Sequence, residues 1–222
     1  MKIKININIK INRVVKFLVL SDLLFLGSWS LIAPLFSVFL IRNVEGATLI
    51  SIGAIAALYW LIKSSLQLPV ANYLDKTDGE KDDFYALIIG LFMASLAAFS
   101  FALVTKMWEA YIAQFIYAVS MALYIPAWSG IFSRHLDSKR ISFDWSLDSA
   151  VIGFASFVTA LLGGILANWL GFSFVFLVVG TASLLSALFI FFAPNLAFPE
   201  KEIDTADGAS LVRDHIPSNI GH

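Results

Sequence analysis

Two ionisable residues stand inside long apolar stretches, Asp22 within residues 17–41 and Lys63 within residues 47–71. A charge at the centre of a bilayer costs at least about 2.5–3.5 kcal/mol on insertion scales, so such residues usually pair or face a water-filled cavity. Counted from the ends that we expect to be cytoplasmic, they lie about six and nine residues deep, roughly 9 and 13 Å. They predict either a proton or substrate site, or a structural ion pair in which Lys63 reaches Asp22.

The composition places these residues in a membrane protein. Hydrophobic residues make up 59% of the 222 residues, charged residues only 14%, and the mean hydropathy is +0.82, whereas soluble domains average about 25% charged residues. About 20 apolar residues cross a bilayer as a helix, and membrane-spanning strands would be short and alternating. The sequence predicts an all-α six-helix bundle with spans at about 17–41, 47–71, 84–105, 108–133, 147–170 and 173–195.

The basic residues predict the orientation of the bundle, because cytoplasmic loops are enriched in Lys and Arg. With the N-terminus inside, the outer loops carry only Arg42 and Lys106. We therefore expect both termini to be cytoplasmic, with a lead-in at 1–14, a membrane domain at 15–195 and a flexible acidic tail at 196–222. The inner segments carry all the remaining basic residues except Lys63: Lys2, Lys4, Lys10, Arg13, Lys16, Lys76, Lys81, Arg134, Lys139, Arg140, Lys201 and Arg213.

Further polar and aromatic residues fall inside the predicted spans. Trp60, near the middle of its span, either lines a cavity for an organic substrate or packs against lipid and neighbouring helices. Asp148, one turn inside its span, either pairs with Arg134 or Lys63 or lines the inner mouth of a cavity. A stripe of small residues in the fifth span predicts close helix packing, either against a second half or within one bundle; its members are Ser156, Ala160, Gly163 and Gly164.

The sequence offers no pattern for other chemistry. There is no cysteine, the net charge is −1, and no metal spacing, nucleotide loop or nucleophile–base pair is present. We therefore predict no catalytic residue, cofactor, metal or nucleic-acid partner, and no enzymatic function.

The charged loop "ANYLDKTDGEKDD" resembles the loop after the second helix of major facilitator superfamily transporters, G-x-x-x-D-R/K-x-G-R-K/R. "GSWSLIAPLF" in the first span and "ALLGGILANWLGFSFVFLVVG" at the fifth and sixth are also similar to that family. The resemblance covers about residues 15–195, one six-helix half of a family that usually has twelve helices. Ala71 and Glu80 depart from the motif, and the matching positions, allowing one insertion, are Asp75, Lys76, Gly79 and Lys81.

The resemblance implies a half-size secondary transporter of the cytoplasmic membrane that moves a small solute by alternating access, as a homodimer or with a partner half. It places Asp22 on the helix that lines the transport path, and Gln114 where many members carry an arginine linked to proton coupling. It also suggests that Asp75 of one copy meets the fifth helix of the other near Ser146. A non-transport scaffold or sensor, and a truncated twelve-helix transporter, are the alternatives. The substrate is not indicated.

Overall fold

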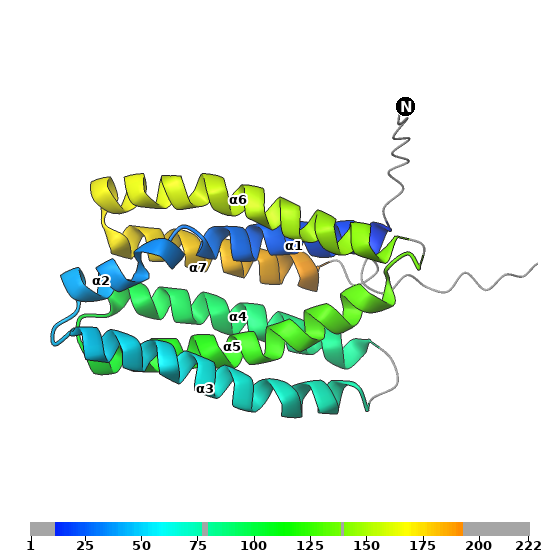
Figure 1. Ribbon diagram of the computed structural model, residues 1–222, viewed down its shortest axis with the longest axis horizontal. Coiled ribbons are helices and arrows are strands. Elements are labelled where there is room, and N and C mark those ends of the chain that lie inside the picture. Colours follow the sequence, from blue (N-terminus) through cyan, green and yellow to red (C-terminus); the bar gives the residue numbers. More distant parts are fainter. Residues whose placement is uncertain (1–11, 77–79, 139, 193–222) are drawn as a thin grey trace, which may run out of the picture.

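The computed structural model describes residues 12–76, 80–138 and 140–192, and Figure 1 shows them as an all-helical bundle. Six helical stretches are long and apolar enough to cross a membrane, and the described residues contain no strand. The predicted fold class is confirmed. The elements are α1 (Arg13–Trp29), the 3-10 helix η1 (Ala33–Leu35), α2 (Phe36–Asn43), α3 (Leu49–Leu74), α4 (Lys81–Leu103), α5 (Met107–Arg134), α6 (Ile141–Leu170) and α7 (Phe172–Phe191).

The first span is broken, where the sequence predicted one continuous helix over 17–41. Its first part α1 ends at Trp29, and η1 and α2 continue it after a turn. Pro34 explains the break, because proline has no N–H to donate and its ring clashes with the preceding turn. At the end of α1, the carbonyl of Leu26 accepts both the N–H of Ser30 at 3.1 Å and its hydroxyl at 2.9 Å.

Most other predicted bounds lie within about four residues of the structure, and two starts differ as follows. The first helix begins at Arg13, where the side chain of Asn12 accepts a hydrogen bond from the N–H of Val14, so the predicted lead-in overlaps it. The helix α6 begins at Ile141 rather than near residue 147. The rest of the lead-in and the predicted tail lie outside the described residues.

Small residues let the central helices approach closely. α4 lies between α5 and α7. A Cβ on Gly90 of α4 would stand 3.0 Å from the backbone of α5 at Ser120 and Tyr124. Toward α7, the hydroxyl of Ser95 donates to the carbonyl of Gly180 at 2.8 Å. Such close contacts and hydrogen bonds are the main attractions between helices in lipid, where burial of apolar surface contributes little.

The helices α3 and α6 lie at opposite edges of the bundle (Figure 1). α3 packs on α5, while α6 packs on α1 and α7. Only 6% of the most apolar stretch of each edge helix is buried, compared with 44–50% in the other four spans. The two edge helices therefore present most of their surface to whatever surrounds the bundle.

The two ends of the bundle are tied by different contacts. At the end where α1 begins, the side chain of Asn12 donates to the carbonyl of His135 at 3.0 Å. At the opposite end, the N–H of Glu45 donates to the carbonyl of Thr105 at 2.8 Å. There, α6 turns directly into α7 through Gly171, whose φ of 85° favours glycine.

Candidate functional site

A pocket of about 200 Å³ opens where the first span breaks. The break turns the chain away from the axis of α1, so residues on both sides of it face α5 around a common space. Apolar and aromatic surface with a few polar groups is typical of sites for small organic ligands. The amide of Gln114 is the one side-chain amide in the lining, which consists of Trp29, Ile32, Ala33, Phe36, Gln114 and Tyr117.

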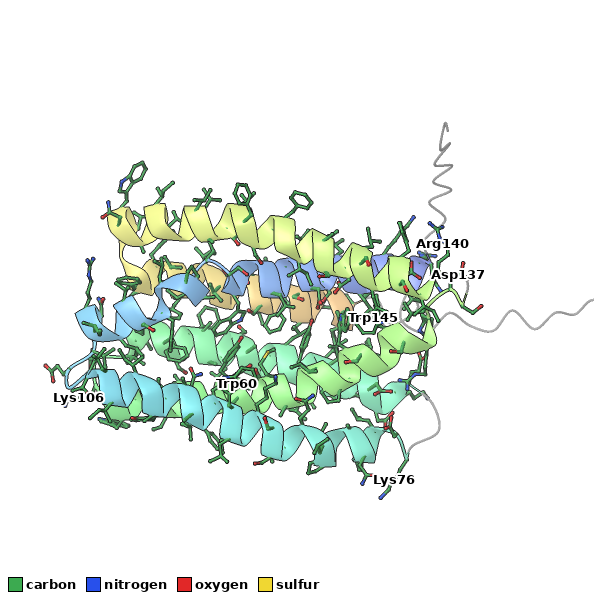
Figure 2. The ribbon with its side chains drawn as sticks, in the orientation of Figure 1. Trp60, Lys76, Lys106, Asp137, Arg140 and Trp145 are labelled. Carbon is green, nitrogen blue, oxygen red and sulfur yellow. The ribbon has the colours of Figure 1, made fainter. Side chains whose placement is uncertain are left out.

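A row of aromatic rings runs from this pocket across three helices. Trp29 of α1 stacks on Tyr117 of α5 with ring centroids 3.9 Å apart, and Tyr117 stacks on Tyr59 of α3 at 5.6 Å. Trp60, labelled near the middle of α3 in Figure 2, meets Tyr59 edge-on at 5.2 Å. The Nζ of Lys63 lies 4.6 Å from the Trp60 ring centroid, a cation–π distance. The row thus links the pocket to the ammonium of Lys63 through stacked and edge-on aromatic rings.

The hypothesis of an ion pair between Asp22 and Lys63 is wrong in this structure. Consecutive spans were taken as neighbours, but α1 packs mainly on α7 and α6, and α3 packs on α5. Among the described residues, no ion pair involves Lys63, whose ammonium lies over Trp60 instead.

Asp22 of α1 and Asp148 of α6 lie on two helices that pack on each other, and both residues are buried, with only 2% and 7% of their surface exposed. In each carboxylate, Oδ1 is buried and has no hydrogen-bond partner within the described part of the chain. The expected partners of Asp148, Arg134 and Lys63, are both engaged elsewhere.

Arg134 instead joins the end of α5 to the beginning of α4. Its Nε lies 3.2 Å from Glu80, and its Nη2 contacts Asp83, which is 2% exposed. The Nδ1 of His135 lies 3.6 Å from Glu80 as well. The sequence signal was present, because Glu80 replaces a basic residue of the transporter motif, but its pairing with Arg134 needs the fold.

The loop motif itself is only partly described. Asp75 caps the C-terminal end of α3 and is exposed, as are Lys76 and Lys81 at the start of α4. Gly79 lies outside the described residues. Lys76, Asp137, Arg140 and Trp145 all lie at this end of the bundle, opposite Lys106 (Figure 2).

The small-residue stripe of α6 is divided between two environments. Ser156 shares a 2.7 Å hydrogen bond with Ser30 of α1, and a Cβ on Gly163 would overlap the backbone carbonyl of Leu31. Ala160 is half-buried, whereas Gly164 has open space where a Cβ would be. Packing within one bundle thus explains Ser156 and Gly163.

The described residues contain no cluster of three His, Cys, Asp or Glu side chains suited to a metal ion.

Comparison with known proteins agrees with this architecture. The solved structure described as "In meso crystal structure of the POT family transporter PepTSo" superimposes with a TM-score of 0.70 at 13% sequence identity, over 84% of this chain and 38% of that one. At that identity the likeness shows the fold alone, and the chain spans well under half the length of its structural neighbour. A comparison with curated proteins finds no match. The family model described as Major Facilitator Superfamily matches residues 18–216, so the chain belongs to the major facilitator superfamily.

Proposed function

We propose that this chain is a half-size secondary transporter that moves a small solute across the cytoplasmic membrane by alternating access. The pocket at the break of the first span carries the proposal. It is open, and its lining comes from the broken first span and from α5. Transporters of this superfamily hold their solute between two six-helix halves. A second copy, or a partner half, would supply the facing wall.

The edge helices offer surfaces for that second half. Gly53, Ala54 and Ala57 are exposed on α3, and Ala150 and Gly153 are exposed on α6. Lipid contact does not require small side chains, whereas helix–helix contact favours them. We propose a homodimer with a two-fold axis along the membrane normal, in which α3 of one copy packs on α6 of the other.

The end that carries Asp75 is proposed to be cytoplasmic. Described basic residues gather at this end, and the opposite end carries Arg42 and Lys106. In the proposed dimer, Asp75 at the end of α3 would approach Ser146 in the second turn of the partner's α6. A carboxylate is stabilised near the positive N-terminal end of a helix, so this contact would favour the outward-open state.

The proposed candidate pathway residues fall into two groups. Gln114 lines the pocket, and Trp60 and Lys63 lie on the aromatic row that leads from it. Asp22 and Asp148, the second group, are buried on the neighbouring helices α1 and α6. The aromatic row suits organic solutes with a flat or apolar face.

Uptake measurements test the transport proposal. The purified chain would first be screened for solutes that raise its unfolding temperature, and these solutes would then be offered to proteoliposomes. We expect saturable uptake that Trp29→Ala weakens and Trp108→Ala leaves unchanged, because Trp108 is exposed at the start of α5, outside the pocket. Stable insertion without uptake of any stabilising solute would favour the scaffold or sensor alternative.

Crosslinking tests the dimer. The chain has no cysteine, so one tagged copy carries Ala54→Cys and a differently tagged copy carries Gly153→Cys. We expect a short thiol crosslinker to join the two tags in membranes. As a control, Leu185→Cys, exposed on α7, should not join Ala54→Cys. Equal yields for both pairs, or monomers throughout, would rule out this interface. A second six-helix segment encoded downstream would assign the facing half to that segment, as the truncation alternative holds.

A further inference from the structure

The ammonium of Lys63 belongs to the middle of α3, far from both ends of the helix. Lys63 is the only charged residue of α3, and the helix continues for eleven residues beyond it to Leu74, about 16 Å along the axis. The four-carbon stem of a lysine cannot span that distance, so the charge stays within the depth of the bilayer. A charge held there is costly unless it meets water or an opposite charge.

No acidic side chain of the described residues forms an ion pair with Lys63. The helix α3 contains no acidic residue, and α5, on which it packs, contains only Glu109. Glu109 lies in the first turn of α5, where it accepts hydrogen bonds from the N–H groups of Thr105 and Lys106. Asp22 belongs to α1, which packs mainly on α6 and α7. The described part of the chain therefore leaves Lys63 without a counter-charge.

The aromatic rings beside Lys63 compensate its charge only in part. The Nζ lies 4.6 Å from the ring centroid of Trp60 and 6.0 Å from that of Tyr59. A cation–π contact recovers less than an ammonium loses when it leaves water for this depth. Lysine has three N–H donors and no acceptor, so the rings hold a cation that can still bind an anion.

The face of α3 that carries Lys63 is polar and open. Ser64 is exposed beside it, and Gln67, four residues after Lys63, is half-buried on the same side of the helix. Trp60, labelled in Figure 2, lies one turn before Lys63 and is 59% exposed. Polar side chains at this depth usually face a water-filled cavity. This surface therefore fits an aqueous path better than it fits lipid.

The same rings connect Lys63 to the pocket at the break of the first span. The ring centroids of Tyr59 and Tyr117 lie 5.6 Å apart, and Tyr117 lines the pocket. The distance from the Lys63 ammonium to the Tyr117 ring cannot exceed this value and the 6.0 Å contact with Tyr59 taken together. The pocket holds about 200 Å³, less than the roughly 300–1,000 Å³ of a complete ligand site. It has room for the apolar body of a compact solute whose polar end stays outside.

A single lysine balances a single negative charge. The other described basic residues lie in loops or in the first or last turn of a helix, so Lys63 is the one described cation at mid-span. A phosphate monoester carries about −1.5 to −2 charges at neutral pH, which one ammonium leaves partly uncompensated. A carboxylate carries one charge and accepts charge-assisted hydrogen bonds from an ammonium.

We propose that the solute is a compact monocarboxylate with an aromatic or otherwise flat apolar body. Its carboxylate pairs with Lys63, and its body enters the pocket beside Trp29 and Tyr117, whose stacked rings offer the flat surface that such a body needs. The inference rests on the proposed transport function, because it names the class of solute that the site takes. Binding of that solute can nevertheless be measured without transport.

Binding of matched acids and amides to the full-length chain in detergent micelles tests the proposal. The panel pairs benzoate, phenylacetate, 3-phenylpropionate and indole-3-acetate with their primary amides, which have nearly the same shape and no charge. Affinities follow from the rise of the unfolding temperature with ligand concentration. We expect at least one acid to bind about tenfold or more tightly than its amide, because only the acid pairs with the ammonium.

Substitutions decide whether Lys63 recognises the charge. Lys63→Gln removes the charge with little change in length and should reduce the preference for the acid to about twofold or less, while the amide binds as before. Lys63→Arg keeps the charge and should keep part of the preference. Lys16→Gln removes an exposed lysine near the start of α1 and should keep all of it. Since each preference compares two ligands on one variant, a general loss of stability cannot imitate the result.

Three results would overturn the proposal: no acid of the panel binds more tightly than its amide, Lys63→Gln keeps the preference, or Lys16→Gln loses it equally. A carboxylate of the facing half that occupied Lys63 would give the first result. Uptake of the labelled ligands into proteoliposomes separates this proposal from transport itself. Binding that depends on Lys63 without uptake would leave the site standing and remove the transport proposal. Saturable uptake of the amides alone would do the reverse.

Discussion

Adding one methyl group at Gly163 should destabilise the chain, because its Cβ would overlap the backbone carbonyl of Leu31. A carbonyl in the backbone cannot rotate away as a side chain can, so α6 must shift away from the break in the first span. Overpacking of this kind costs about 1–3 kcal/mol, and a rigid neighbour favours the upper end. Replacing glycine by alanine within a helix returns about 0.5–1 kcal/mol. The net cost of Gly163→Ala is about 2 kcal/mol.

The neighbouring residue provides a matched control. A Cβ on Gly164 would meet nothing within 4 Å. Gly164→Ala should therefore gain only the stability that alanine adds over glycine within a helix. At about 2–4 °C per kcal/mol for a chain of this size, Gly163→Ala should lower the unfolding temperature in micelles by about 4–8 °C, while Gly164→Ala should leave it unchanged or raise it slightly. If both variants shifted the temperature in the same direction by the same amount, the close contact between α6 and Leu31 would not exist as described.

Two further contacts give measurable expectations. Arg134→Gln should lower the free energy of unfolding by about 1–2 kcal/mol, because it leaves the buried carboxylate of Asp83 without its cation; the value is kept low because the arginine is partly exposed to solvent. Arg134→Lys should recover part of the loss. Equal stability of the wild type and both variants would show that the contact is not energetically significant. Ser30→Ala and Ser156→Ala should each lower the free energy of unfolding by about 1 kcal/mol. The double variant should lose much less than the sum of the two, because both changes remove the same hydrogen bond. Additive losses would mean that the two hydroxyls do not meet.

The positions of the spans could be predicted from the sequence because each is a long apolar run, and length alone separates such helices from strands. The break in the first span was not predicted, although the stretch "GSWSLIAPLF" contains Pro34. The sequence stays apolar through the break, and hydropathy alone does not distinguish a straight helix from one that turns inside the membrane. The pocket depends on that turn, so its lining could be only partly anticipated, through Gln114.

The pairing of charges could not be predicted from sequence order. An ion pair between Asp22 and Lys63 is one prediction from the sequence, because their spans are consecutive. The fold instead places α1 beside α6 and α7. The sequence predicts that Asp148 either pairs with Arg134 or Lys63 or lines the inner mouth of a cavity, and the structure holds both basic side chains elsewhere. In both cases the residues were correctly recognised as unusual, and the partner was set by which helices touch, a property of the whole bundle.

The position of α1 has a consequence for how the chain is made. Its main neighbours α6 and α7 leave the ribosome after the other described helices, and its hydrogen bond between Ser21 and Ser186 joins residues 165 apart in sequence. By contrast, α3, α4 and α5 can assemble as soon as they emerge, because each packs on a helix close in the chain. Contacts between distant segments form late and slowly. During synthesis α1 is therefore inserted in the bilayer before its main packing partners exist, and Asp22 lacks its eventual surroundings until α6 and α7 arrive.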